Sequence, residues 1–224
     1  MVKNKKLIIF GNTKYAEMVC DYFSEYSEYE VCAFTVNKKY KNKDIFYNKP
    51  IVNFEDIENI FNPLEYEVFI AIGSSNLNKV REYIYNQVLS KGYNLATFVH
   101  PDAYIGKKVL IGKNCIIMEC CRILTRTKIG NNVIIWPSAF ISHDNLIKDH
   151  CYIVGSTNGF CEVGENCFLG AGAMIADNVK IAKNNFITMS AVIRKDTDED
   201  SIYEGIPAKK RQGISATFFA QHIK

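Results

Sequence analysis

Apolar residues recur at every sixth position through the second half of the chain. A period of six fits neither the 3.6 residues of a helical turn nor the alternation of a strand, and it is typical of a parallel β-helix built of hexapeptides. Three hexapeptides would close one triangular coil, and residues 105–198 then predict roughly five coils stacked at about 4.8 Å. The first register holds Ile105, Ile111, Ile117, Ile123, Ile129, Ile135, Ile141, Ile147 and Ile153; the second holds Val163, Leu169, Ile175, Ile181, Ile187 and Ile193.

Two further positions of the hexapeptide follow from this geometry. Glycine comes after the aliphatic residue in several repeats, where we expect it to ease the backbone around a corner. Four positions after the aliphatic residue the side chain should again point inward and be small, which makes Cys115, Cys121, Cys151 and Cys167 core residues. Asn145 and Asn185 occupy the same position, and there we expect local bulges or stacked amides.

The first 98 residues alternate strand and helix signals. Apolar strands are predicted in "KLIIFG", "YEVCAFTV", "EVFIAIG" and "NLATFVHP", with helices over residues 13–26 and 76–91. Val80, Ile84 and Val88 or Leu89 would form the buried face of the second helix. This alternation predicts a Rossmann-like α/β domain with a parallel sheet and a ligand crevice at the loops after Phe10, Phe34 and Ile72. The expected domains are residues 1–98, residues 99–211 and a tail, 212–224, that packs on the prism or on a neighbouring subunit.

The six-residue register breaks once, between Ile147 and Val163. These residues are 16 apart, whereas three regular repeats need 18. Two residues are missing either just before His150, which we favour, or after Ile153. A gap after Ile153 would make His150 a surface residue.

Composition narrows the function classes. A net charge of +3 with 23% charged residues gives no sign of nucleic-acid binding. No apolar run approaches the roughly 18 residues of a membrane span, and "LIIF" is too short for the core of a signal peptide, so we expect a soluble, cytoplasmic protein without membrane insertion. The eight cysteines form no CxxC pair, and no metal site is predicted.

The motifs "LIIFGNTKYAE", "VFIAIGSSNLNKVR", the hexapeptide run, "ISHDNLI" and "YEGIPAKKR" together carry a family resemblance. Over residues 5–211 the chain resembles the two-domain bacterial sugar acetyltransferases of the left-handed β-helix superfamily, which include bacillosamine-pathway and perosamine N-acetyltransferases and sialic-acid O-acetyltransferases. The resemblance implies a left-handed parallel β-helix and a homotrimer with active sites between neighbouring prisms. It also implies that the N-terminal domain holds a nucleotide-linked sugar and that acetyl-CoA lies along the outer groove.

The resemblance assigns the chemistry to "SHD". An amine that attacks a thioester must lose a proton, and a histidine has a pKa suited to accept it. His143 aligns with the family's catalytic base, and Asp144 aligns with the acidic residue thought to raise the pKa of that base. No Ser-His-Asp arrangement is visible, so direct transfer without a covalent enzyme intermediate is the simpler mechanism.

Binding residues are also carried over from the resemblance. His150 falls at an acetyl-CoA contact if the gap precedes it, and Tyr152 takes that place if the gap follows Ile153. The expected acetyl-CoA contacts are His150, Ala171 and Met189, although Met189 is bulkier than the family's glycine. The expected sugar-nucleotide contacts are Gly11, Thr13, Lys14, Tyr15, Val36, Asn37 and Gly73, with Val36 and Asn37 standing where relatives often have acidic residues.

Four functions remain open at this stage. The first is an N-acetyltransferase acting on a nucleotide-linked amino sugar, and the second is an O-acetyltransferase acting on a sugar or sialic-acid hydroxyl. A zinc lyase of the γ-carbonic-anhydrase kind would need three histidine ligands, which the spacing of His100, His143 and His150 fits poorly. A non-catalytic sugar-nucleotide-binding scaffold would bind without turnover.

Overall fold

The computed structural model describes residues 2–222, which divide into two compact units. The first unit comprises residues 1–73 and 83–98, and the second comprises residues 74–82 together with everything from Val99 onward. Residues 74–82 belong to the second unit, and so does the described part of the tail.

The first unit is built on a six-stranded sheet in the order β3-β4-β2-β1-β5-β6. β1 is buried from Leu7 to Phe10, as its unbroken apolar run predicts. All pairings are parallel except the hairpin β3–β4. The elements are β1 (Lys5–Phe10), α1 (Lys14–Tyr26), β2 (Tyr29–Val36), η1 (Lys38–Tyr40), β3 (Ile45–Phe46), β4 (Lys49–Asn53), η2 (Phe54–Asp56), α2 (Ile57–Ile60), β5 (Tyr66–Ile70), α3 (Lys79–Ser90, shared with the second unit) and β6 (Asn94–Leu95).

The second helix differs from its sequence prediction. α3 begins at Lys79 instead of residue 76, because Asn76, Leu77 and Asn78 all have positive φ. Ile84 and Val88 are buried as expected, whereas Val80 is 41% exposed and Arg81 is completely buried. The hairpin β3–β4 and α2 were not predicted, and "NLATFVHP" splits into β6 and β7 (Phe98–Val99).

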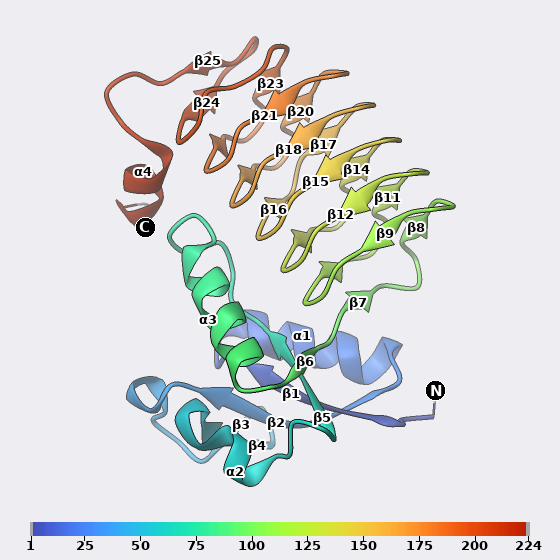
Figure 1. The fold of residues 1–224 in the computed structure, drawn as a ribbon, viewed down its shortest axis with the longest axis vertical. Helices are drawn as coiled ribbons and strands as arrows, with labels where there is room; N and C mark the ends of the chain where they lie inside the picture. The colour runs from blue at the N-terminus through green and yellow to red at the C-terminus, as the bar shows by residue number, and fades with distance from the viewer. Residues whose placement is uncertain (1, 223–224) are drawn as a thin grey trace. The chain divides into compact units, whose positions relative to one another are not determined.

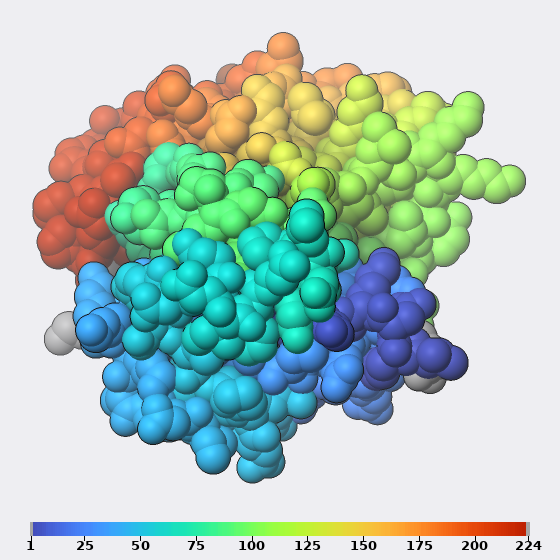
Figure 2. Space-filling model, turned by 60° about the horizontal axis from the view of Figure 1, so that its bottom comes forward, coloured from blue at the N-terminus to red at the C-terminus, as the bar shows by residue number. Residues whose placement is uncertain are grey.

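The second unit is a parallel β-helix with three sheets of stacked two-residue strands (Figure 1). In the space-filling view its successive coils follow one another as adjoining bands of colour from green to red (Figure 2). Its strands are β8 (Tyr104–Ile105), β9 (Leu110–Ile111), β10 (Ile116–Ile117), β11 (Arg122–Ile123), β12 (Lys128–Ile129), β13 (Ile134–Ile135), β14 (Phe140–Ile141), β15 (Leu146–Ile147), β16 (Tyr152–Ile153), β17 (Ser156–Thr157), β18 (Glu162–Val163), β19 (Phe168–Leu169), β20 (Met174–Ile175), β21 (Lys180–Ile181), β22 (Phe186–Ile187), β23 (Val192–Ile193), β24 (Ile202–Glu204) and β25 (Lys209–Lys210). After them, α4 (Ala216–His222) packs on this unit, where Phe219 contacts Phe186 edge-on at 5.1 Å.

Each six-residue corner of the β-helix from Lys108 to Ser190 turns at a residue with left-handed backbone conformation, three positions after the aliphatic residue. These residues define three edges, and asparagine is frequent among them because it tolerates positive φ. The first edge follows β8, β11, β14, β17 and β20; the second follows β9, β12, β15, β18 and β21; the third follows β10, β13, β16, β19 and β22. Their corner residues are Lys108, Arg126, Asp144, Phe160 and Asn178 on the first edge, Asn114, Asn132, His150, Asn166 and Asn184 on the second, and Cys120, Ser138, Gly172 and Ser190 on the third.

Glycines beside the aliphatic positions serve close stacking and do not turn the corner. At Gly164, a Cβ would lie 2.6 Å from the backbone nitrogen of Lys183 in the next coil. The same crowding by the following coil occurs at Gly106, Gly112, Gly130 and Gly170. The expectation that the glycine next to the aliphatic residue eases the corner was therefore wrong, because none of these five glycines has a positive φ.

The two missing residues lie after Ile153, so the favoured placement before His150 was wrong. Ile153 pairs with Ile135 and Leu169, whereas Thr157, only four residues later, pairs with Ile141 and Ile175. The shortened corner is Val154–Gly155 on the third edge, where a Cβ on Gly155 would lie 2.7 Å from the Ala173 carbonyl oxygen. Aligned residues of neighbouring coils are thus 18 apart, or 16 across this corner.

The core positions follow the prediction with one addition. Cys115, Cys121, Cys151 and Cys167 are buried, and Cys161, displaced by the short corner, joins them. Burial raises the pKa of the Cys115 thiol to about 12 and that of Cys121 to about 11, so these thiols stay protonated near neutral pH.

Neither Asn145 nor Asn185 stacks its amide on the other repeats. Each amide instead bonds to backbone carbonyls of its own corner and of the next coil: Asn145 Nδ2 donates to the carbonyl oxygens of Ser142 and, one coil later, Asn158 at 2.8 and 2.9 Å. Asn185 Nδ2 donates to the carbonyls of Ala182 and Asp198, both at 2.9 Å.

The stacking glycines give a first test. We expect Gly164→Ala to lower the free energy of unfolding by about 1–3 kcal/mol, because the added methyl group overlaps the backbone of the next coil. Gly73→Ala is the matched control, since a Cβ there meets nothing within 4 Å. Urea denaturation measures both; equal stability of the two variants would contradict this explanation of the repeat.

Candidate active site

His143 and Asp144 lie at the first edge, in the corner that follows β14. The Nδ1 atom of His143 donates to Asp144 Oδ2 at 2.8 Å, and Asp144 has φ +57°. The corner bends the backbone enough for the adjacent side chains of His143 and Asp144 to meet. Because a carboxylate only accepts hydrogen bonds, Nδ1 carries the proton and Nε2 is the basic nitrogen.

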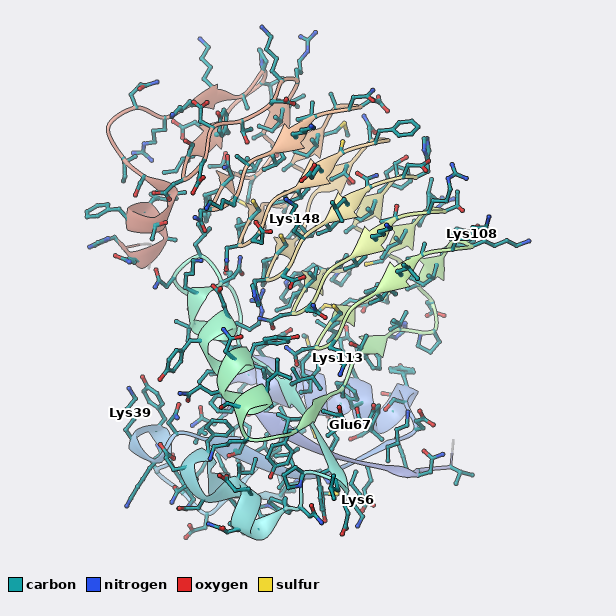
Figure 3. The ribbon with its side chains drawn as sticks, in the orientation of Figure 1. Lys6, Lys39, Glu67, Lys108, Lys113 and Lys148 are labelled. Carbon is teal, nitrogen blue, oxygen red and sulfur yellow. The ribbon has the colours of Figure 1, made fainter. Side chains whose placement is uncertain are left out.

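Arg126, one coil earlier at the same edge, completes this group. Its Nε and Nη2 donate to Oδ1 and Oδ2 of Asp144, each at 2.6 Å. The Arg126 guanidinium and the His143 ring hold the pKa of the Asp144 carboxyl down to about 2, so Asp144 stays ionised near neutral pH. The carboxylate therefore fixes the imidazole tautomer and can stabilise an imidazolium. Lys108 marks this edge in Figure 3, where its side chain extends away from the β-helix.

The next coil packs directly on the imidazole. Phe160 meets the His143 ring edge-on, with centroids 5.1 Å apart. At Gly159, a Cβ would lie 2.8 Å from Cε1 and 3.1 Å from Nε2 of His143, so only glycine leaves the ring this position. The His143 side chain is 40% exposed, which leaves it accessible from the edge.

His150 lies at the second edge and is buried, contrary to the surface position expected with a gap after Ile153. A ladder of side chains holds it: Asn114 Nδ2 donates to Asn132 Oδ1 at 2.7 Å, and Asn132 Nδ2 donates to His150 Nδ1 at 2.9 Å. The Nε2 atom lies 3.9 Å from Glu82 Oε1. Burial lowers the pKa of the His150 imidazole, which favours its neutral form.

The Arg81 side chain holds the corner at His150 through hydrogen bonds to backbone carbonyls. Its Nη2 donates to the carbonyl oxygens of Asn132, His150 and Cys151 at 3.1–3.2 Å, and its Nη1 donates to Asn78 Oδ1 at 3.2 Å. A planar guanidinium can satisfy several convergent carbonyls at once. The sequence analysis did not identify Arg81, because its helical spacing does not indicate contact with backbone carbonyls of the β-helix.

The other expected acetyl-CoA contacts lie at the third edge. Ala171 and Met189 occupy the same place in consecutive coils and are exposed, Met189 by 73%. Gly155, in the shortened corner, is the residue of the preceding coil that aligns with Ala171. Tyr152, the alternative to His150, is half-buried in an aromatic row on the neighbouring sheet, stacked on Phe168 at 5.2 Å. A single chain thus brings His143 and Asp144 together but leaves Ala171 and Met189 on a different edge.

The expected sugar-nucleotide contacts gather at the carboxyl ends of β1, β2 and β5, which are neighbours in the sheet. Gly11 has φ +142°, and a Cβ there would lie 2.8 Å from the Ala71 carbonyl oxygen. Thr13 and Lys14 are exposed, Tyr15 is half-buried, and open space lies over Gly73. Thr13 occupies the N-cap position of α1 without a side-chain capping bond.

Val36 and Asn37 differ in what they can offer a ligand. The Val36 side chain is 3% exposed and packs in the sheet. Asn37 approaches Glu55, whose carboxylate also accepts from the Lys38 backbone N–H at 2.9 Å. Asn37, Lys38, Lys39, Glu55 and Tyr83 line a surface hollow of about 510 Å³. Glu55 thus supplies a carboxylate after β2 although the sequence has none there.

Within residues 2–222, no group of three or more His, Cys, Asp or Glu side chains is arranged to hold a metal ion. No helix in the same range is long and apolar enough to cross a membrane.

Two parts of the chain match known family models. Residues 6–88 match the family model of the PglD N-terminal domain, and residues 160–195 match that of the bacterial transferase hexapeptide (six repeats). The expected fold class, an α/β Rossmann-like domain followed by a left-handed parallel β-helix, is confirmed.

Particular relatives fit this class. The chain is 26% identical over 140 residues to GDP-perosamine N-acetyltransferase of Escherichia coli O157:H7, covering 61% of this chain and 63% of the relative. It is 29% identical over 131 residues to serine acetyltransferase of Staphylococcus aureus, covering 56% of this chain and 55% of the relative. Both alignments span less than two thirds of the relatives' own lengths.

Two solved structures share the fold over nearly the whole chain. The acetyltransferase domain of PglB from Neisseria gonorrhoeae has a TM-score of 0.82 at 21% identity, covering 93% of this chain and all of that one. PerB from Caulobacter crescentus, solved in complex with CoA and GDP-perosamine, has a TM-score of 0.80 at 23% identity, covering 92% and 97%.

The buried histidine gives a test of the second edge. Because the folded pKa of His150 is lowered, the unfolded chain binds more protons below about pH 6.5, and stability should fall as the pH drops from 7.5 towards 5.5. We expect His150→Asn to flatten this slope while keeping the left-handed corner, since asparagine occupies four other corners of this edge. Urea midpoints across this pH range measure it; an unchanged slope in the variant would contradict the assignment.

Proposed function

We propose that the protein is an acetyl-CoA-dependent N-acetyltransferase acting on a nucleotide-linked amino sugar. The observation that carries the proposal is the His143–Asp144–Arg126 group on the edge of a hexapeptide β-helix. It places a histidine with a fixed tautomer at an accessible position, and the chain also carries a PglD-type N-terminal domain. The related GDP-perosamine N-acetyltransferase and the PerB complex with CoA and GDP-perosamine support the substrate class.

In the proposed reaction, His143 Nε2 is the general base. The acceptor amine attacks the carbonyl carbon of the thioester, and its N–H proton passes to Nε2 as the C–N bond forms. The C–S bond then breaks, the CoA sulfur leaves with the bonding electrons, and the imidazolium returns the proton to it. The products are an amide and free CoA thiol, and the ionised Asp144 stabilises the imidazolium between the two proton transfers.

A covalent enzyme intermediate is not needed for this scheme. The five cysteines of the β-helix core are buried, and burial raises the pKa of each thiol for which a shift is resolved. Direct transfer between two bound substrates therefore agrees with the side chains at the first edge.

We further propose that the site is completed by a second copy of the chain in a homotrimer. His143 lies on the first edge, whereas the acetyl-CoA candidates Ala171 and Met189 lie on the third. In a cyclic assembly the first edge of one prism would face the third edge of the next. The shortened corner Val154–Gly155 would then widen the acetyl-CoA groove at the third edge.

For the sugar nucleotide we propose the loops after β1, β2 and β5, with Gly11, Thr13, Lys14, Tyr15, Asn37 and Gly73 as contacts. The loop after β1 leads into the N-terminus of α1, and the positive end of the helix dipole there favours anionic groups. All eight cysteines are free, which fits the reducing cytoplasm in which nucleotide sugars would be available.

Thiol release from acetyl-CoA tests the reaction directly. We expect turnover with one member of a panel of UDP-, dTDP- and GDP-linked amino sugars, and a 10²–10⁴-fold lower kcat in His143→Ala, because that variant lacks the general base. Its thermal unfolding should match the wild type, as the side chain is half-exposed.

The panel also includes the hydroxyl counterparts of each sugar. Turnover of hydroxyl sugars alone would replace N-acetylation by O-acetylation, and full activity of His143→Ala would remove His143 from its role. Binding of a sugar nucleotide without any turnover would favour a non-catalytic scaffold.

A further inference from the structure

A second carboxylate, Asp177, borders the space in front of the basic nitrogen. Asp177 follows β20 at the first edge, in the coil after Gly159, and is exposed. Its Oδ1 accepts a hydrogen bond from the Gly159 backbone N–H at 3.0 Å. His143, Gly159 and Asp177 therefore stack in one column, with glycine between the two side chains that carry chemistry.

The position of Gly159 shows how close the side chains of His143 and Asp177 come to each other. The point that a Gly159 Cβ would occupy lies 3.1 Å from His143 Nε2 and 3.4 Å from Asp177 Oδ1. Since Nδ1 of His143 is engaged by Asp144, the basic nitrogen and the Asp177 carboxylate border the same small space. An acceptor that reaches Nε2 from the edge comes within reach of this carboxylate.

The two carboxylates near the base differ in what they can bind. Both oxygens of Asp144 accept from Arg126, and Oδ2 also accepts from His143, so its charge is already compensated. Asp177 gives one oxygen to a backbone N–H, a bond that an uncharged asparagine could also accept. The corner does not require an acid, because Lys107, Thr125 and Lys195 occupy the same place in other coils.

We propose that Asp177 is an acceptor-binding residue that selects an amine over a hydroxyl. The inference rests on the proposed function and deepens it. A sugar amine resembles an α-amino group, with a pKa of about 7.7–8.0, and is largely cationic at pH 7. A carboxylate attracts this ammonium and gives no such preference to a neutral hydroxyl. Asp177 thus holds the nitrogen beside Nε2 until it loses its extra proton to water and attacks.

The Asp177→Asn variant tests the charge of this side chain apart from its structural role. The variant keeps the volume and the hydrogen bond to Gly159 but loses the charge. At pH 7 we expect the KM for the amino-sugar nucleotide to rise about 5-fold, the size of an ion pair of roughly 1 kcal/mol, with kcat little changed. At pH 9.5, where the amine is neutral, the difference should disappear. The other charged and titratable groups of this edge, namely Lys107, Lys108, Arg126, His143, Asp144, Lys195 and Asp196, are the same in the variant and in the wild type.

Asp196→Asn is the matched control. Asp196 lies one coil further along the same edge and likewise accepts a backbone N–H, from Lys180 at 2.8 Å. We expect no change in KM for this variant. An equal rise in both variants, or a rise in Asp177→Asn that persists at pH 9.5, would overturn the inference, since neither reflects attraction of an ammonium.

The inference and the proposed function fail in different ways. Wild-type turnover of hydroxyl sugars alone leaves acetyl transfer standing and overturns the role of Asp177. If no acceptor is turned over, the proposed function fails, and calorimetric titration with the amino-sugar nucleotide in the presence of CoA decides the inference. A Kd about 5-fold weaker in Asp177→Asn at pH 7 supports it, and equal Kd values overturn it.

Discussion

The whole β-helix depends on one constraint: the chain must enter the left-handed backbone region once in every six residues. Non-glycine residues meet this constraint at every corner from Lys108 to Ser190 except Gly172 and the short corner. Each coil then lies flat on the one before it, with parallel backbone hydrogen bonds between them. Residues at equal places in neighbouring coils therefore form columns, and a column can hold several chemical groups within hydrogen-bonding distance.

The first edge shows how such a column becomes a candidate site. Arg126 and Asp144 are 18 residues apart and form a two-bond ion pair, and the left-handed turn at Asp144 brings its carboxylate onto the neighbouring His143. The shortened coil then places Gly159 against the imidazole, and the next regular coil adds Asp177. The second edge shows that such a column can also stabilise the fold. Asn114, Asn132 and His150 form a buried ladder of hydrogen bonds there, and Arg81 donates to the backbone carbonyl of His150.

The sequence predicted the parts of this structure that depend on periodicity. The six-residue register, the inward cysteines and the pairing of His143 with Asp144 all follow from spacing and from a family resemblance. The position of the gap did not follow, because both placements preserve the aliphatic register at Val163, and only strand pairing separates them. Arg126 could have been found by counting 18 residues back from Asp144. Arg81 could not, because nothing in its local sequence indicates that three carbonyls converge on it. Glu55 was not predicted because it lies in η2, after β4, and only the fold brings it to the loop after β2.

We propose that the corner geometry places the base and the proposed acetyl-CoA contacts on different edges, so that two copies of the chain share one site. Mixed trimers test it most directly: chains with His143→Ala are co-expressed with chains carrying Ala171→Trp, each variant being inactive alone. The account predicts recovery of about one quarter of wild-type activity in a random mixture, since a site works wherever an unsubstituted first edge meets an unsubstituted third edge. Mixed assemblies no more active than the separate variants would contradict it.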